Sequence, residues 1–287
     1  MPASKIMKFH NGYEVEKSVE GISLVRQNLR DIDLTFLSGL CDVNPSGSEL
    51  SREREDYIKK VLNPLFAEGK IDTGVRFDDR KLRFSGARIK DGTLEILTGI
   101  TYYQRFKQDY QRDETESMAL QELGKKNFGD KYAYFSRPLG VSAAFLTSDK
   151  SLFVGERNND DDHGQIGLVS GYIDYRENLQ EISVMENLSR EANEELGMSS
   201  STIDAAEMIG VFTHPFRGDV DITYLVTTSH SRDYFLSNMW RKNAKDREHK
   251  QLIEICSYKQ IQKMLSIGNF QYPARGLLEN LVPNDFD

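Results

Sequence analysis

Residues 190–198 read Arg-Glu-Ala-Asn-Glu-Glu-Leu-Gly-Met and carry the strongest structural signal of the chain. Residues three and four apart share one face of an α-helix, so this spacing predicts that the carboxylates of Glu191, Glu194 and Glu195 converge. Three hard oxygen donors in one place suit Mg²⁺ or Mn²⁺. The alternative is an ordinary solvated helix in which Arg190 pairs with Glu194 four residues later.

The chain before this acidic helix has the pattern of strands and turns. The predicted elements, in order, are a strand over 139–145, a turn over 147–150, a strand over 151–157, a polar loop over 158–164 and a strand over 165–170 that leads into Gly171. The acidic helix therefore follows directly on a compact set of strands, which an isolated solvated helix does not require.

This order of elements resembles that of the Nudix hydrolases, enzymes that cleave a diphosphate linked to another group. Residues 190–198 match the second half of the family motif position by position, and Gly171 and Glu177 have the spacing of its first half. Twelve residues separate Glu177 from Arg190, where the motif has seven. The resemblance implies an α/β/α sandwich with a mixed sheet over residues 137–287. The strand and helix patterns upstream predict a smaller α+β domain over residues 1–136.

Two further blocks narrow the resemblance. Residues 97–106 and 137–144, together with the longer spacer inside the motif, are similar to the branch that includes animal UDP-glucose diphosphatases and their plant relatives. The branch implies a UDP-sugar as substrate, cleaved to UMP and a sugar 1-phosphate. ADP-ribose or another nucleotide-sugar is the alternative substrate, and a non-catalytic module that senses a nucleotide is the alternative function.

The resemblance also implies roles for the residues of the acidic helix. Glu191, Glu194 and Glu195 would bind Mg²⁺ or Mn²⁺, and Arg190 would organise the helix through a salt bridge. A divalent cation is needed because the oxygens around a diphosphate repel a nucleophile. The general base is left open between Glu194 or Glu195 and a carboxylate from outside the helix, Asp221 or Glu254. Gly171 is expected to allow a tight turn before the helix.

Several residues outside the helix are candidates for contact with the substrate. Arg157, at a strand end, is placed to bind phosphate through its planar guanidinium, and His214 and Arg217 follow in a later loop. Aromatic residues could stack on a base. The candidates are Tyr102, Tyr103, Phe212 and Phe216, each of which could equally be a core residue. Asp221 is also a candidate substrate contact, although its setting is that of an ordinary half-buried strand.

Composition excludes some classes of protein. A net charge of −8 over 287 residues argues against a general grip on nucleic acid. Two cysteines far apart in sequence suggest free, buried thiols in a reducing compartment. The N-terminus has no apolar leader and no apolar stretch approaches the length of a membrane span, so we expect a cytoplasmic protein. A homodimer is left open.

The remaining elements follow from periodicity and turn residues. In the first half we expect a helix over 51–66, strands over 75–77, 81–84 and 94–97 with a turn over 90–92, a charged helix over 101–124 and a turn over 125–130. In the second half we expect strands over 206–212 and 220–227, a helix over 233–243, a strand over 253–256, a helix over 258–265, and a final helical stretch preceded by Pro273 and Gly276.

Overall fold

The computed structural model describes residues 12–18, 21–27, 31–41, 80–159, 162–176, 182–237 and 239–286. Within these ranges, eight strands form one mixed sheet in the order β1-β9-β10-β5-β6-β11, with β7 paired to β6 and β8 paired to β5. Strand β10 runs parallel to β5, and the other neighbours are antiparallel. The strands are β1 (Glu14–Val15), β5 (Leu139–Thr147), β6 (Leu152–Arg157), β7 (Ile166–Gly167), β8 (Val169–Tyr172), β9 (Ile203–Thr213), β10 (Val220–Thr228) and β11 (His249–Ile255).

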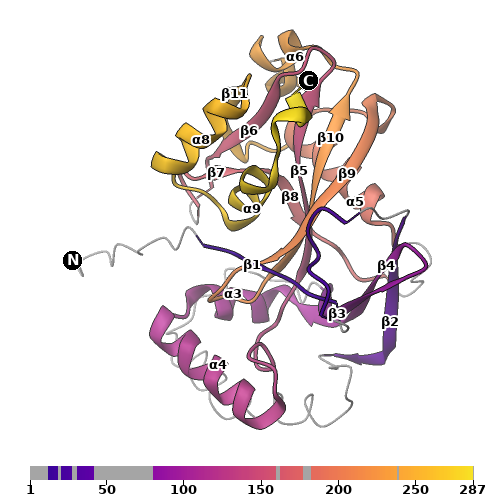
Figure 1. The fold of residues 1–287 in the computed structure, drawn as a ribbon, viewed down its shortest axis with the longest axis vertical. Helices are drawn as coiled ribbons and strands as arrows, with labels where there is room; N and C mark the ends of the chain where they lie inside the picture. Colours follow the sequence, from indigo (N-terminus) through magenta and orange to yellow (C-terminus); the bar gives the residue numbers. More distant parts are fainter. Residues whose placement is uncertain are drawn as a thin grey trace.

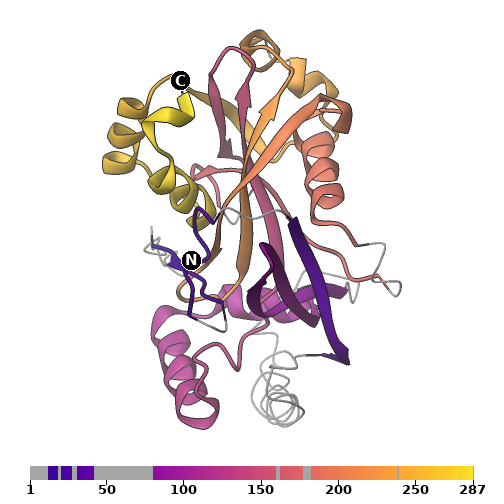
Figure 2. The same ribbon diagram turned by 45° about the vertical axis from the view of Figure 1, so that its right-hand side comes forward.

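Helices cover both faces of this sheet. Helix α5 (Val184–Leu196) packs on one face, and helices α8 (Tyr258–Ile267) and α9 (Tyr272–Asn280) pack on the other (Figures 1 and 2). Successive residues of β5 alternate between the two cores, because side chains along a strand point to opposite faces: Val141 and Ala143 face α5, and Ala144 faces α9. The predicted mixed sheet between helices is confirmed.

Helix α5, the predicted acidic helix, is bounded by local signals. Ser183 is its N-cap, and its side chain accepts a hydrogen bond from the backbone N–H of Glu186. Gly197 ends the helix with a φ of 67°, a left-handed conformation that glycine adopts without a steric penalty. Leu188, Ala192 and Leu196 recur at helical spacing and are buried against the sheet. The opposite side of the helix is left to charged residues.

A second, three-stranded sheet has the order β2-β4-β3, from Asp31–Cys41, Thr93–Tyr102 and Arg80–Lys90. The predicted strands at 81–84 and 94–97 and the turn between them are confirmed as an antiparallel hairpin. The backbone N–H of Phe84 donates to the carbonyl of Arg137, and that of Leu82 donates to Ile173. These bonds tie the small sheet to the start of β5 and the end of β8, next to the proposed boundary between residues 136 and 137.

The helix predicted over 101–124 is two helices. Residues 101 and 102 belong to β4; α3 then covers Tyr103–Gln111 and α4 covers Glu114–Phe128. The break occurs because Asp113 caps a new helix: its side chain accepts from the backbone N–H of Glu116, whose carboxylate accepts from Asp113 in return. The predicted turn over 125–130 was also wrong at its start, since α4 continues to Phe128 and Gly129 makes the turn.

The C-terminal elements differ from expectation in their boundaries. The predicted helix over 233–243 is two short helices, α6 (Arg232–Leu236) and α7 (Met239–Asn243). Pro273 and Gly276 lie inside α9 rather than before it: Pro273 occupies its first turn, where a proline costs no hydrogen bond. Cys256 is free and exposed, not buried, because it lies just beyond the end of β11. The predicted helix over 51–66, the strand over 75–77 and the side chain of Cys41 lie outside the described residues.

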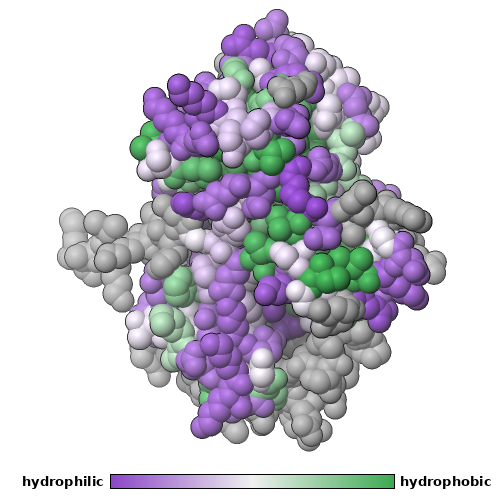
Figure 3. All heavy atoms as spheres, viewed as in Figure 1, coloured by the Kyte–Doolittle hydropathy of each residue, from purple (hydrophilic) through white to green (hydrophobic). Residues whose placement is uncertain are grey.

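The described part of the surface is largely polar. Hydrophilic residues predominate over α4 on the face in Figure 3, as expected for a chain with 29% charged residues. In the described part of the chain, none of the helices combines the length and the apolarity that crossing a membrane requires.

Candidate functional site

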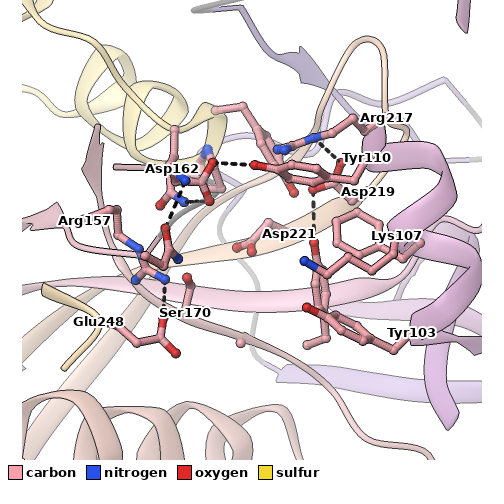
Figure 4. A pocket seen from close by; sticks show the side chains of 17 residues that line it. Tyr103, Lys107, Tyr110, Arg157, Asp162, Ser170, Arg217, Asp219, Asp221 and Glu248 are labelled. Carbon is pink, nitrogen blue, oxygen red and sulfur yellow. Dashed lines mark hydrogen bonds and ion pairs between the residues drawn. The ribbon is translucent and has the colours of Figure 1, made fainter. Parts of the chain in front are cut away.

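A cavity of about 250 Å³ lies on the α9 side of the sheet, between α3, the start of α9 and strands β6, β8 and β10 (Figure 4). Its lining is rich in charged and aromatic side chains. The lining residues are Tyr103, Phe106, Lys107, Tyr110, Arg157, Asn159, Asp162, Ser170, Gly171, Tyr172, Arg217, Asp219, Asp221, Glu248, Gln271, Tyr272 and Pro273. The predicted residues Arg157, Arg217, Asp221, Gly171 and Tyr103 are thus brought together.

Strands β5 and β6 of the sheet separate beside this cavity, and the gap between them connects the cavity to α5. Strands β5 and β6 pair only near Phe145 and Phe153; further along, β5 pairs with β8 and β6 pairs with β7. The strand predicted over 165–170 is therefore two strands, broken at Leu168, where the chain passes from one partner strand to the other. Side chains in this gap can reach from the cavity wall to the helix on the opposite face.

Arg157 is the side chain that makes this connection. It lines the cavity, is 4% exposed, and its Nη1 lies 3.2 Å from Oε2 of Glu195 on α5. The same nitrogen donates to the carbonyl of Leu168, and Nη2 pairs with Glu248. Arg157 therefore lines the cavity, but its guanidinium is bound to carboxylates rather than exposed at a strand end.

Glu195 is held by three partners. Its Oε1 accepts the backbone N–H of Ser170 at 2.9 Å, and its Oε2 lies 2.7 Å from Nε2 of His249 as well as next to Arg157. Burial alone would raise the pKa of Glu195, but His249, Arg157 and the Ser170 N–H hold it below its usual value. Glu195 is therefore a buried anion fixed directly behind the cavity wall.

Glu191 and Glu194 are joined by Arg190. Nη2 of Arg190 lies 2.6 Å from Oε1 of Glu191, and Nη1 lies 3.0 Å from Oε2 of Glu194, so the predicted salt bridge within the helix is present. Burial, together with the carboxylates of Glu195 and Glu194, raises the pKa of Glu191 to about 7 even though Arg190 opposes the shift. The acidic residues of α5 therefore repel one another across a short distance.

Gly171 does not make the turn that the sequence predicted. It lies within β8, and its φ is not positive. A Cβ atom at this position would overlap the carboxylate of Glu191. The need for glycine is therefore close approach: the Glu191 side chain lies directly against the backbone of a residue that lines the cavity.

The carboxylates of the three glutamates of α5 do not converge on a common point. Among the described residues, no three histidine, cysteine, aspartate or glutamate side chains are gathered closely enough to hold a metal ion. Glu195 is engaged by Arg157 and His249, and the other two by Arg190. The assignment of Glu191, Glu194 and Glu195 as metal ligands stays a prediction.

Asp221 extends from β10 into the middle of the cavity (Figure 4). It is 5% exposed and accepts hydrogen bonds from Oγ of Ser142 at 2.5 Å and Oγ1 of Thr223 at 3.2 Å. Burial raises its pKa to about 7, against the opposing effect of the two hydroxyl groups. Asp221 can therefore exchange a proton near neutral pH, as a general base or acid must.

The wall opposite Arg157 is built by α3 and the loop before β10. Arg217 lies over the ring of Tyr110, 4.4 Å from its centroid, with Nε 3.4 Å from Oδ1 of Asp219. Lys107 lies over the rings of both Tyr103 and Tyr110, at 5.6 and 5.5 Å. This wall thus combines aromatic rings with two cations that lie over the ring faces.

Other predicted residues lie away from the cavity lining. Tyr102 ends β4 and does not line the cavity, and His214 uses Nδ1 to accept the backbone N–H groups of Phe216 and Arg217. Phe212 is fully buried in the α9-side core, and Phe216 is not among the lining residues. Glu254 pairs with Arg232, which with a hydrogen bond from Ser151 lowers its pKa to about 2. Glu177 lies outside the described residues.

Several residues of the cavity lining, and His249 behind it, were not predicted from the sequence. Lys107 and Tyr110 lie in a charged helical segment, Asp219 precedes the strand that carries Asp221, and Glu248 and His249 follow a polar loop. Asp219 could have been found from the alternation Asp219-Val220-Asp221, which places both carboxylates on one face of a strand. No local pattern distinguishes Glu248 or His249, because their partners are distant in sequence.

Comparisons with known proteins concern the fold. No family model and no curated protein matches the chain. Solved structures that it resembles include a MutT protein from Methanosarcina mazei (15% identity over 50% of this chain and 90% of that one, TM-score 0.35). Another is the Nudix domain of Shewanella oneidensis NrtR complexed with ADP ribose (14% identity over 55% of this chain and 94% of that one, TM-score 0.36). A third is a MutT Nudix hydrolase from Burkholderia pseudomallei (19% identity over 50% of this chain and 98% of that one, TM-score 0.35). At these identities and TM-scores the likenesses assign no substrate.

Proposed function

We propose that this chain is a metal-dependent hydrolase that cleaves the diphosphate bond of a nucleoside diphosphate linked to another group. The observation that carries the proposal is the contact between α5 and the cavity wall. Glu191 lies against Gly171, and Glu195 binds both Ser170 and Arg157; all three of these partners line the cavity. The acidic helix expected from the sequence is therefore directly behind a cavity that can hold a ligand.

The residues of α5 fit a divalent cation by their chemistry. Glu191, Glu194 and Glu195 offer only carboxylate oxygens, which Mg²⁺ and Mn²⁺ prefer. The pKa of Glu191 is raised by burial and by its acidic neighbours, and a bound cation would relieve that repulsion. Such a cation would neutralise charge on the diphosphate and lower the pKa of an attacking water.

The cavity supplies the remaining functions of a diphosphate hydrolase. Arg157 and Lys107 place positive charge on the cavity wall for phosphate oxygens, with the Arg157 guanidinium already paired with Glu195 and Glu248. Arg190 keeps Glu191 and Glu194 in position. Among the candidate bases, Asp221 lies in the cavity, whereas Glu254 is held by Arg232 outside the lining. We therefore place proton transfer on Asp221 or Glu194 rather than on Glu254.

We propose a UDP-sugar, such as UDP-glucose, as the substrate, with UMP and a sugar 1-phosphate as products. The proposal rests on the branch resemblance of residues 97–106 and 137–144, and the tyrosine rings of α3 offer faces for stacking a base. Stacking alone does not distinguish uracil from adenine, so ADP-ribose and other nucleotide-sugars are the alternatives. A nucleotide sensor without turnover is the alternative outside enzymology.

The test is product analysis with a substrate panel. UDP-sugars, ADP-sugars, ADP-ribose and dinucleotides are incubated with Mg²⁺ or Mn²⁺ and the full-length chain, beside the variant Glu194→Gln. Glu122→Gln is the matched control, because Glu122 lies exposed on α4, outside the cavity lining, and loses the same charge. Metal binding to each protein is measured separately by calorimetry.

We expect UDP-sugars to yield UMP and sugar 1-phosphate with the wild type and with Glu122→Gln. Glu194→Gln should lose both turnover and metal affinity. Turnover of adenine nucleotides alone would support the hydrolase proposal and refute UDP-sugars as the substrates. If nothing is hydrolysed and a nucleotide binds without metal, the chain is a sensor and the proposed reaction is wrong.

A further inference from the structure

Two neighbouring carboxylates form the floor of the cavity beneath α3. Asp219 precedes β10 and Asp221 lies within it, and both line the cavity. They are 2% and 5% exposed, so each is removed from bulk water. A buried carboxylate is costly unless hydrogen-bond donors surround it, so the donors around this pair decide what the floor can bind.

Asp219 has an acceptor atom with no donor. Its Oδ2 accepts the hydroxyl of Tyr172 at 3.3 Å. Its Oδ1 lies 3.4 Å from Nε of Arg217, but within the described part of the chain neither atom has a hydrogen-bond partner. An ionised carboxylate oxygen buried in this way leaves a hydrogen bond unmade. A ligand in the cavity that carries a donor can complete it.

The second oxygen of Asp221, Oδ2, accepts neither of the hydrogen bonds from Ser142 and Thr223. Ser142 and Thr223 both donate to Oδ1. Its Oδ2 lies over Gly140, where a Cβ atom would approach it to 2.8 Å. The absence of a side chain at Gly140 thus makes room for this oxygen. Two hydroxyl groups inside the protein already show the type of donor that the Asp221 carboxylate accepts.

The charges around the floor favour an uncharged ligand group. The charged groups that act on this pair include further carboxylates: Asp219 acts on Asp221, and Asp162 acts on Asp219. Arg217 is paired with Asp219, and Arg157 is paired with Glu195 and Glu248 on the other side of the cavity. An anionic group at the floor would face like charges in a site of low dielectric. A neutral group with several hydroxyls would donate to them instead.

We infer that Asp219 and Asp221 bind the hydroxyl groups of an uncharged sugar, so that the group linked to the nucleoside diphosphate is a neutral polyol rather than an anion. The inference rests on the proposed function in that it takes the diphosphate to lie towards Arg157 and α5, with proton transfer then assigned to Glu194 rather than to Asp221. The rings of Tyr172 and Tyr272 line the same part of the cavity and offer apolar faces to a sugar ring. The two carboxylates then select a neutral sugar over an anionic one, because they accept its hydroxyl groups and repel a negative charge.

The test compares two ligands that share a base, a ribose and a diphosphate. UDP-glucose carries a hydroxymethyl group where UDP-glucuronate carries a carboxylate. Calorimetry at pH 8 with Ca²⁺ measures the dissociation constants of both for the full-length wild type, Asp221→Asn, Asp219→Asn and Glu122→Gln. Asparagine keeps the shape of each floor residue and removes its charge, and Glu122→Gln removes a charge far from the floor. Chromatography with Mg²⁺ or Mn²⁺ follows hydrolysis of the same ligands separately.

The wild type and Glu122→Gln should bind UDP-glucose at least about tenfold more tightly than UDP-glucuronate, because placing like charges together is strongly unfavourable. Asp221→Asn should narrow that ratio at least about threefold by tightening the binding of UDP-glucuronate. Asp219→Asn should narrow the ratio of dissociation constants in the same way, and it replaces Asp221→Asn as the test if that variant does not fold.

The results separate the two proposals. Tighter binding of UDP-glucose than of UDP-glucuronate, without hydrolysis, would support sugar binding by Asp219 and Asp221 and refute the hydrolase proposal. Two results would refute sugar binding by Asp219 and Asp221 while leaving the hydrolase proposal intact. One is hydrolysis of both ligands together with equal dissociation constants. The other is hydrolysis together with an unchanged ratio of the two dissociation constants in folded Asp221→Asn and Asp219→Asn. Failure of the wild type to bind either ligand would refute sugar binding by Asp219 and Asp221.

Discussion

Gly171 and Glu191 share a space that admits only one side chain. The carboxylate of Glu191 on α5 lies against the backbone of Gly171 on β8, where any Cβ atom would overlap it. Gly171 lines the cavity, and Glu191 belongs to the helix behind it. The two residues therefore bring the acidic helix into contact with the ligand cavity.

Replacing Gly171 by alanine should displace Glu191 and reduce function more than folding. We expect a loss of metal affinity or activity of about 10- to 100-fold, the range found when the groups that orient ligands are disturbed. Overpacking should lower the free energy of unfolding by about 1–3 kcal/mol. Gly12→Ala is the control, since among the described residues a Cβ there would approach only Pro215, at 4.0 Å. Equal activity of the two variants would show that the close contact has no functional role.

Glu194 and Glu195 should differ in their effect on stability. Glu195→Gln leaves Arg157 without its buried anion, which should lower the free energy of unfolding by about 3–5 kcal/mol. Glu194→Gln removes only a half-exposed pair with Arg190 and should cost about 0–1 kcal/mol. Urea unfolding of both variants without added metal measures the difference. Similar losses in the two would contradict the role of Glu195 as a structural anion.

Asp221 should make the stability of the wild type depend on pH. Its pKa in the folded protein is about 7, above the ordinary value of 3.8, because it is buried. The folded state therefore keeps a proton that the unfolded state loses, and the wild type should lose stability as the pH rises from about 4 to about 7. The shift corresponds to at most about 4 kcal/mol. Asp221→Asn lacks this titration.

Unfolding free energies of wild type and Asp221→Asn at pH 5 and pH 8 test this. The advantage of the variant should be larger at pH 8 than at pH 5. The other titrating groups are common to both proteins, so their contributions largely cancel in the comparison. An advantage that does not change with pH would mean that Asp221 does not titrate in this range.

The rings on α3 should affect binding of the nucleotide rather than the chemical step. Tyr103 lines the cavity and its neighbour Tyr102 does not, so Tyr103→Leu and Tyr102→Leu form a matched pair. Loss of one stacking ring should raise KM about twofold to tenfold with little change in kcat. Steady-state kinetics on the preferred nucleotide-sugar give both values. An equal rise of KM in the two variants would point to a general disturbance of the helix start instead.

The sequence predicted best where the signals are local. The acidic helix was predicted from the spacing of its glutamates. Its ends were not predicted, although Ser183 and Gly197 are local capping residues. The helix over 101–124 was mispredicted because charged residues obscured its period, although Asp113 and Glu116 form a capping box that marks the break. Cys256 was expected to be buried because cysteine usually is, and only its place beyond a strand end exposes it.

The acidic helix and the order of the strands around it could be predicted from the sequence. The partners of its carboxylates and the lining of the cavity depend on the folded chain. Arg157 meets Glu195 across 38 residues, Ser142 meets Asp221 across 79, and Arg157 meets Glu248 across 91. The physical reason is that helix periods and caps depend on neighbours within one or two turns, whereas these contacts exist only after the sheet has brought distant strands side by side.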